Sequence, residues 1–349
     1  AADDGLFVAT TLLNGNYYYA VSTLVASVED TTVIAGENSL QNPITETVEE
    51  PWPVFQQTKL IENKPVKIYS TFTSMKYETG QPLMNNAGFL VNDFAVYMNG
   101  QSAGERPLHV RFHGGGADFL YNITTALDSE INLNPEDFFP SGDNASWWGA
   151  NENFDLFSGD NNLVPPTTGI NYNFTYQQVA HMIDWAVYHL PVDSNRIYLE
   201  GSSLGCIGAY FYTLHFPDRI AAVKLSGSVF NLGFQNDYNP MCSLNPGKSN
   251  RVSGDLQFGT VSSNLVTNLG GRTYDVLNGG LVTGAGSLKD YPVIYSINGK
   301  NDTIVGWTEK TIYYDSVNAH HTGGYYFWDG RNHGGNTGTT WGDDLFDLF

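Results

Sequence analysis

The sequence predicts an α/β protein in which a mostly parallel central sheet is covered by helices on both faces. Three observations support this fold class. The 349 residues are 41% hydrophobic and 14% aromatic but only 15% charged, a composition typical of a folded chain with a sizeable core. Runs rich in β-branched and aromatic residues alternate with helical periodicity in the second half. No internal repeat with a period of about 20 to 50 residues is visible, which argues against a propeller or a solenoid.

The first part of the chain is expected to be β structure. We expect residues 1–60 to form an N-terminal β-rich segment packed on the core, and residues 61–349 to form one α/β domain. A run of aromatic and β-branched side chains at 17–25 predicts a strand in the N-terminal segment, and a connector containing Pro and Glu follows at 42–53. Further strands are predicted at 66–73, 93–98 and 108–112.

Residues 117–170 have a different composition, rich in Asn, Asp and Gly, and they predict a long loop insertion. A loop of this length inside a domain is usually functional, so we expect a lid or a binding wall. Trp147 and Trp148 lie in this polar stretch and are candidate substrate-binding residues. The acidic residues between 143 and 160 do not have the spacing of an EF-hand loop, and no metal site is expected.

Helices and strands alternate in the remainder of the chain. Thr175 is predicted to cap a helix that extends to Leu190, with Gln178 at the capping-box position and apolar residues at helical spacing. The elements predicted after it are a strand at 196–200, a helix at 204–215, strands at 221–225 and 291–297, a helix at 308–317 and a strand at 324–328.

The charge balance excludes several classes of partner. Sixteen basic and 36 acidic side chains give a net charge of −20, which would repel nucleic acid and anionic membrane surfaces. No apolar run approaches the roughly 18–20 residues that span a bilayer, so we expect a soluble protein. The low Lys content and the many Asn, Gly, Thr and Tyr residues favour an exported protein, secreted to the extracellular space or the periplasm. Cys206 and Cys242 either form a disulfide or remain two buried thiols, and both alternatives stay open.

The strongest functional signal is Gly201-Ser202-Ser203-Leu204-Gly205, between a predicted strand and a predicted helix. A sharp strand–turn–helix connection of the form Gly-x-Ser-x-Gly projects the serine hydroxyl above the edge of the sheet. The helix N-terminus beside it favours developing negative charge. Ser203 is therefore the candidate nucleophile.

A glycine run supplies the second element of a catalytic site. His113-Gly114-Gly115-Gly116 follows the strand predicted at 108–112. Backbone N–H groups of Gly115 and Gly116, together with the N–H of Leu204, are candidates for an oxyanion hole, since glycines let the backbone approach a ligand closely.

A nucleophilic serine requires a base and an orienting carboxylate, which follow it in the order acid, then His. His333 lies directly after the last predicted strand, where it would reach the carboxyl edge of the sheet. Asp302 follows the strand at 291–297 and would reach the same edge. The residues expected at the surface instead are His320, His321, Asp290 and Asp315.

Together these motifs resemble the α/β-hydrolase serine esterases. The stretch from Val192 to Gly205 is similar to the nucleophile segment of the secreted polyhydroxyalkanoate-depolymerase and feruloyl-esterase-like group, and to that of prolyl-oligopeptidase-type hydrolase domains. The resemblance covers residues 100–349 and implies Ser203 as nucleophile, His333 as general base and acid, and Asp302 as its orienter. It also implies that Gly115, Gly116 and Leu204 form the oxyanion hole.

The resemblance implies a secreted carboxylic ester hydrolase that works through an acyl-enzyme without a cofactor. Its substrate would be a small ester, an acylated polysaccharide or a polyester, and Trp307 is a further candidate contact. Two alternatives remain: a serine peptidase of the prolyl-oligopeptidase type, and a hydrolase-fold binding protein without activity. The oligomeric state is not predicted.

Overall fold

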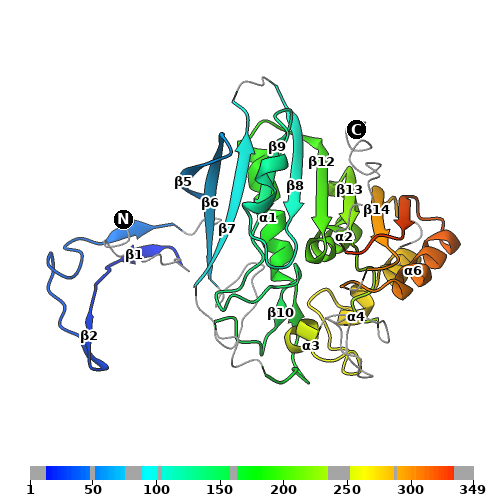
Figure 1. Ribbon diagram of the computed structural model, residues 1–349. Coiled ribbons are helices and arrows are strands. Elements are labelled where there is room, and N and C mark those ends of the chain that lie inside the picture. Colours follow the sequence, from blue (N-terminus) through cyan, green and yellow to red (C-terminus); the bar gives the residue numbers. More distant parts are fainter. Residues whose placement is uncertain are drawn as a thin grey trace.

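The structure is a computed structural model that describes residues 13–47, 52–74, 89–100, 104–157, 163–234, 252–286, 289–302 and 304–333. Its central feature is a nine-stranded sheet with the strand order β5-β6-β7-β9-β8-β12-β13-β14-β15 (Figure 1). The bounds of these strands are β5 Val54–Ile61, β6 Lys64–Ser74, β7 Phe89–Met98, β8 Arg106–Phe112, β9 Ile131–Pro135, β12 Val192–Ser202, β13 Ala222–Ser226, β14 Val293–Gly299 and β15 Tyr325–Asp329.

The sheet is parallel from β9 to β15 and antiparallel from β5 to β9. Parallel strands require crossover connections, and helices supply them here. The helices are α1 Phe174–His189, α2 Leu204–His215, α3 Val252–Phe258, α4 Thr273–Val276, α5 Gly279–Ala285 and α6 Thr308–Ala319, with 3₁₀ helices at η1 Tyr121–Thr125 and η3 Pro217–Arg219. None of the described helices is long and apolar enough to cross a membrane.

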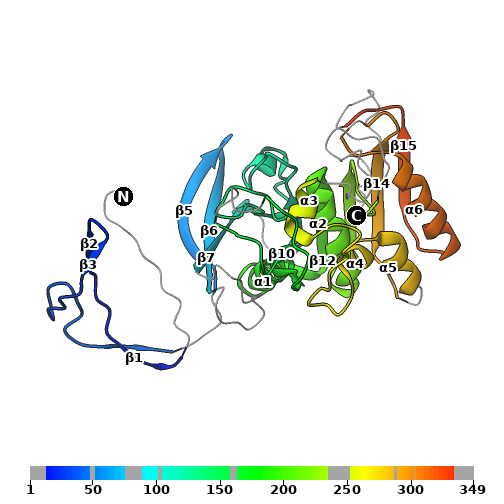
Figure 2. The ribbon, with the colours of Figure 1, turned by 90° about the horizontal axis from the view of Figure 1, so that it is seen from below.

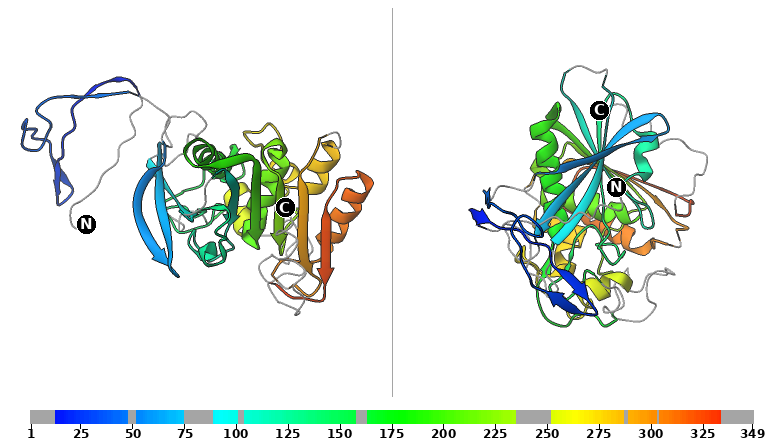
Figure 3. Two further views of the ribbon diagram at one scale, coloured as in Figure 1. Left: turned by 90° about the horizontal axis from the view of Figure 1, so that it is seen from above. Right: turned by 90° about the vertical axis from the view of Figure 1, so that its left-hand side faces the viewer.

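The register of the sheet shows which face each helix covers. Phe112 of β8 pairs with Gly201 of β12, and the pairing continues residue by residue across β13 and β14 to Tyr326 of β15. Residues paired in this way point to the same face of the sheet. Gly208 of α2 lies against Phe112, and Tyr313 of α6 packs on Tyr326, so both helices lie on one face. Figure 3 shows α1, α2 and α6 together on this side of the sheet.

The opposite face is covered beside β6 and β7 by η1. Ile123 of η1 is fully buried in a cluster with Val66 and Tyr97, whose side chains point away from α1 and α2. The mostly parallel sheet confirms the predicted fold class, with α1, α2 and α6 on one face and, among the described residues, the 3₁₀ helix η1 on the other.

The N-terminal segment departs from the prediction. Two separate two-stranded sheets form there, from β1 Gly15–Tyr17 with β4 Ile44–Glu46 and from β2 Thr23–Val25 with β3 Val28–Asp30. Most side chains in 13–47 are exposed, and Figure 2 shows this segment extending away from the main sheet. The predicted packing of residues 1–60 on the core is therefore wrong for residues 13–47. The short strands pair with one another, and β5 instead forms the edge of the central sheet.

The predicted loop insertion at 117–170 also needs correction, because it contains a core strand. Residues 131–135 form β9, which lies between β7 and β8 and is buried throughout. The stretch also carries β10 Ala150–Asn151, which pairs with β11 Asn171–Tyr172. Asn132 and Asn134 are buried, as is Leu133 between them, so both faces of β9 are covered. Because two of its residues are polar, the strand does not have the apolar pattern by which a buried strand is predicted from sequence.

The other predicted elements agree closely with the structure. Helix α2 has the predicted bounds, whereas α1 begins at Phe174 with Asn173 as its N-cap, so the predicted cap at Thr175 is wrong. Thr175 is buried in the first turn, where the chain packs against the 145–148 turn through its backbone N–H to Trp148 O at 3.1 Å.

Candidate active site

Ser203 occupies the sharp connection between β12 and α2, at the carboxyl edge of the sheet. Its backbone has φ 54° and ψ −117°, a strained conformation for a residue with a side chain. Its N–H donates to Ser226 O of the neighbouring strand at 2.8 Å. The turn therefore holds the hydroxyl of Ser203 above the sheet, half-buried, beside the first turn of α2.

The two flanking glycines are required by close backbone approach. A Cβ atom on Gly201 would lie 2.3 Å from the carbonyl oxygen of Gly205. A Cβ atom on Gly205 would lie 2.1 Å from the carbonyl oxygen of Phe112 on β8. Side chains at either position would push the helix away from the sheet, so both glycines serve the geometry of the turn.

The structure brings Ser203, His333 and Asp302 into one hydrogen-bonded row. The Ser203 hydroxyl donates to Nε2 of His333, with 2.8 Å between the two atoms. The Nδ1–H of His333 donates to Oδ2 of Asp302, also at 2.8 Å. With its Nδ1–H on Asp302, the imidazole presents Nε2 to the serine hydroxyl, the arrangement that a general base requires.

Asp302 is held as a carboxylate by its hydrogen bonds. Burial by itself would raise the pKa of Asp302, but the hydrogen bond from His333 and those from the backbone N–H groups of Ile304 and Val305 lower it below its ordinary value. The two amides donate to Oδ1 at 2.8 and 2.9 Å. Oδ1 is therefore occupied by the backbone, and Oδ2 is left for the imidazole.

The loops that carry Asp302 and His333 are bound to each other. Lys300 N–H donates to Asp329 O at 2.8 Å, and Asn301 N–H donates to Arg331 O at 3.1 Å. The Asn301 side chain adds a bond to Gly330 O at 2.6 Å. These bonds extend the β14–β15 pairing beyond the strand ends, and they set the distance between acid and base.

Gly227 is a site residue that the sequence analysis did not identify. It follows β13 directly, has φ +70°, and its N–H donates to Ile297 O at 2.9 Å. A Cβ atom here would lie 3.1 Å from Cε1 and 3.3 Å from Nδ1 of His333. Its position just after a predicted strand, at the edge that carries Ser203, was the signal available in the sequence.

A buried carboxylate anchors the segment after Gly227. Glu309 of α6 is 1% exposed and accepts hydrogen bonds from the N–H groups of Phe230 and Asn231, the latter at 2.7 Å. Lys310 donates to the same carboxylate at 2.9 Å. Burial raises the pKa of Glu309 in spite of Lys310 and the two amides. Helix α6, which follows Asp302 in the chain, thus also holds the segment after Gly227, the glycine that lies against the His333 ring.

The glycine run lies beside Ser203. A Cβ atom on Gly114 would be 3.2 Å from Ser202 O and 3.6 Å from Cβ of Ser203, and one on Gly115 would be 3.9 Å from Cβ of Leu204. Gly115 and Gly116 are exposed, and Ala117 N–H closes a turn on Gly114 O at 3.2 Å. Gly115 therefore lies beside Leu204, and the oxyanion-hole role of Gly115, Gly116 and Leu204 stays a prediction.

His113 and Glu136 hold this glycine turn from beneath. His113 is 1% exposed; its Nε2 is 2.8 Å from Oε1 of Glu136 and its Nδ1 is 3.0 Å from Gly114 O. Both partners are acceptors, so the ring donates to both only when protonated. Burial lowers the pKa of His113, but the bonds to Glu136 and Gly114 outweigh it and raise the pKa above its ordinary value. Glu136 was not among the predicted site residues.

Trp147 and Trp148 do not contact substrate, which corrects that prediction. Both are fully buried. The Trp147 ring packs 4.8 Å from the rings of Phe112 and His113, and its Nε1 donates to His113 O at 3.2 Å. Their polar sequence surroundings suggested exposure, but the 145–149 turn folds inward against α2 and covers the core.

Trp307 is half-buried at the N-cap of α6, five residues beyond Asp302, and its role as a substrate contact stays a prediction. Cys206 is a buried, free thiol in the part of the chain that the structure describes, and its Sγ lies 3.0 Å from Gly201 O; a disulfide with Cys242 stays a prediction. Cys242 itself lies outside the described residues. Burial raises the pKa of Cys206 to about 12, which leaves it protonated beneath the nucleophile turn.

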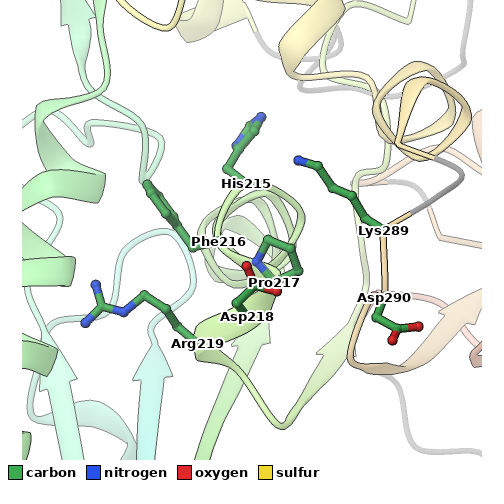
Figure 4. A pocket seen from close by; sticks show the side chains of 7 residues that line it. All are labelled: His215, Phe216, Pro217, Asp218, Arg219, Lys289 and Asp290. Atoms are coloured by element: carbon green, nitrogen blue, oxygen red, sulfur yellow. The ribbon is translucent and has the colours of Figure 1, made fainter.

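A cavity of about 440 Å³ lies far from this site, at the C-terminal end of α2 (Figure 4). Because α2 has 12 residues, the cavity is roughly 18 Å along the helix from Ser203. Lys289 extends toward His215 across it, while Arg219 is ion-paired with Asp184. The reactive side chains predicted from the sequence, Ser203, Asp302 and His333, lie together at the opposite end of α2 and not at this cavity. Among the described residues, no three His, Cys, Asp or Glu side chains cluster as metal ligands.

No protein-family model matches the chain, and no curated protein matches it in sequence. Among solved structures, an S-formylglutathione hydrolase from Agrobacterium tumefaciens is similar with a TM-score of 0.55 and 13% identity, over 84% of this chain and 97% of that chain. A candidate dipeptidyl aminopeptidase IV from Bacteroides ovatus is similar with a TM-score of 0.51 and 13% identity, over 95% of this chain and 42% of that chain. This likeness shows that the chain has the α/β-hydrolase fold.

Proposed function

We propose that this protein is a secreted serine hydrolase that cleaves carboxylic esters through an acyl-enzyme on Ser203. The observation that carries the proposal is the row of two 2.8 Å hydrogen bonds from Ser203 through His333 to Asp302. A strained serine at a strand–helix turn, an imidazole hydrogen-bonded to its hydroxyl and a carboxylate behind the imidazole are the parts of a nucleophilic acyl-transfer site.

The reaction begins when Oγ of Ser203 attacks the ester carbonyl while Nε2 of His333 takes the hydroxyl proton. The imidazolium formed is stabilised by the Asp302 carboxylate, which keeps its own charge. His333 then delivers the proton to the departing alkoxide, which leaves as the alcohol. Water enters, gives a proton to His333 and attacks the acyl-enzyme; the free acid leaves and Ser203 regains its proton.

The negative charge that develops on the carbonyl oxygen needs donors in place before the reaction. The N–H of Leu204 begins α2, where the first-turn N–H groups have no acceptor within the helix. With Gly115 or Gly116 it would form the oxyanion hole, and one such donor is worth about 3 kcal/mol of transition-state stabilisation. His113 and Glu136 act as positioning residues for this turn through the bond to Gly114 O.

The decisive experiment replaces the nucleophile. Ser203→Ala should retain the native circular dichroism spectrum and lose hydrolysis of p-nitrophenyl acetate by on the order of a thousandfold or more. The wild-type protein should also be labelled by a fluorophosphonate probe, and the variant should not. Retained turnover in Ser203→Ala, or no labelling of the wild type, would refute the proposal. A panel of peptide amides separates an esterase from a peptidase, since an esterase leaves the amides intact.

A further inference from the structure

Three aromatic rings form a partly exposed surface beside the loops of the candidate active site. Trp328 of β15 stacks on Tyr314 of α6, with 5.2 Å between ring centroids and 21° between planes. Trp307 lies 6.0 Å from Trp328 at an angle of 52°. Trp328 is 45% exposed and Trp307 is half-buried. One face of Trp328 is thus supported by Tyr314, and much of the remaining ring is open to solvent.

The surface is joined in the chain to both loops that hold the reactive groups. Trp328 precedes His333 by five residues, and Trp307 follows Asp302 by five residues. Strand β15 is three strands away from β12, and neighbouring strands lie about 4.8 Å apart, so the surface is roughly 14 Å from Ser203 across the sheet edge. A small ester bound at Ser203 would not reach it, whereas a polymer would.

The chemistry of the surface fits a sugar ring. A flat indole with one face supported offers a rigid apolar platform, and exposed aromatic rings lose little conformational entropy when they bind. Polar groups border it: Lys300 and Asn301 are exposed, and Nζ of Lys300 lies 5.8 Å from the centroid of the Trp307 ring. Sugars present an apolar C–H face and hydroxyl groups around their edge, which match these two features. The net charge of −20 favours a neutral polymer over an acidic one.

We propose that Trp328 and Trp307 form a subsite that binds the glycan chain of an acylated neutral polysaccharide while Ser203 attacks its ester. This inference rests on the proposed function, and it names the substrate class of the same site. Trp328 supplies the stacking face, Trp307 extends the platform toward the Asp302 loop, and Lys300 and Asn301 supply hydrogen bonds to sugar hydroxyls.

The test measures binding without catalysis, in the full-length chain carrying Ser203→Ala. Affinity electrophoresis in acetylated xylan should show binding that falls roughly fivefold or more when Trp328→Ala is added. Phe327→Ala is the matched control: Phe327 is the neighbouring residue on β15, is also 45% exposed and points to the opposite face of the sheet. It should leave the binding within about twofold of the parent protein, because its ring is no part of the platform.

Three results would overturn the inference. The first is equal binding of acetylated xylan by Trp328→Ala and its parent. The second is that Trp328→Ala loses binding to poly-3-hydroxybutyrate film but not to acetylated xylan, which would indicate that the surface binds a polyester. The third is a dimer by light scattering that Trp328→Ala dissociates, which would assign the surface to a second copy of the chain. In the active protein, the ratio of acetylated-xylan to p-nitrophenyl acetate turnover should also fall with Trp328→Ala. If the wild type hydrolyses neither acetylated xylan nor p-nitrophenyl acetate, the proposed function is refuted. The binding measurement in Ser203→Ala still tests the glycan subsite, because it does not depend on catalysis.

Discussion

Gly227→Ala tests whether the close contact beneath the imidazole sets the catalytic geometry. The added methyl group would lie 3.1 Å from Cε1 and 3.3 Å from Nδ1 of His333, and 3.9 Å from Oδ2 of Asp302. Carbon atoms in favourable contact are about 3.5–4.0 Å apart, so the imidazole must move by several tenths of an ångström. The movement strains the hydrogen bonds that His333 makes with Ser203 and Asp302, each 2.8 Å long in the wild type.

Two effects of different size follow from this substitution. Since Gly227 has φ +70°, alanine there costs about 1–2 kcal/mol of backbone strain in the folded state. Alanine also lowers the conformational entropy of the unfolded chain, which returns about 0.4–1 kcal/mol of stability. The displaced imidazole should lower kcat/KM for p-nitrophenyl acetate by about tenfold, because a misplacement of 1 Å can cost about a hundredfold. The loss of activity should therefore exceed what the modest loss of stability explains.

A matched variant separates strain from contact. Gly270 has φ +85° and no heavy atom within 4 Å of an added Cβ, so Gly270→Ala carries the backbone strain alone. Urea unfolding followed by circular dichroism should give similar losses of stability for both variants, whereas kcat/KM should fall only in Gly227→Ala. Equal kcat/KM values for the two variants would show that the reasoning about His333 is wrong.

Two further predictions concern the charged partners of the histidines. Asp302→Asn should lower kcat by about a thousandfold or more, because the imidazolium loses its carboxylate. The fold lowers the pKa of Asp302, so the contribution of its carboxylate to stability is complete above the ordinary Asp pKa. This contribution is lost as the pH falls through the lower pKa of the folded state. Urea unfolding should therefore show that the difference in unfolding free energy between wild type and Asp302→Asn is smaller at acid pH than at neutral pH. Glu136→Gln should weaken the fold most below the ordinary His pKa, because the pKa of His113 is raised, and the effect on urea unfolding should fade as the pH rises through that raised value. A pH-independent loss of stability in Glu136→Gln would contradict the assigned ion pair.

The sequence was most informative where a function depends on local order along the chain. The strand–turn–helix pattern around Ser203 predicted the nucleophile and the bounds of α2, because the turn and the helix that follows it are specified by neighbouring residues. Asp302 and His333 were predicted from their positions just after strands. Since parallel strands end at the same edge, residues that follow them meet without any further information.

Burial was predicted less well, because it depends on which distant segments meet. Strand β9 was not predicted because it contains the polar residues Asn132 and Asn134, although both are buried. Trp147 was predicted to be exposed because its sequence neighbours are polar, whereas the structure places its ring in the core. The supports of the site share this property. Gly227 matters only because the distant His333 rests on it, and Glu136 matters only because His113 faces it.

The order of residues by itself therefore determined which side chains could react and at which edge of the sheet they would lie, since strand and helix periodicity are local properties. Tertiary structure alone decided how the imidazole is held, which tryptophans are buried and where residues 13–47 lie, because those outcomes depend on contacts between segments that are far apart in the chain.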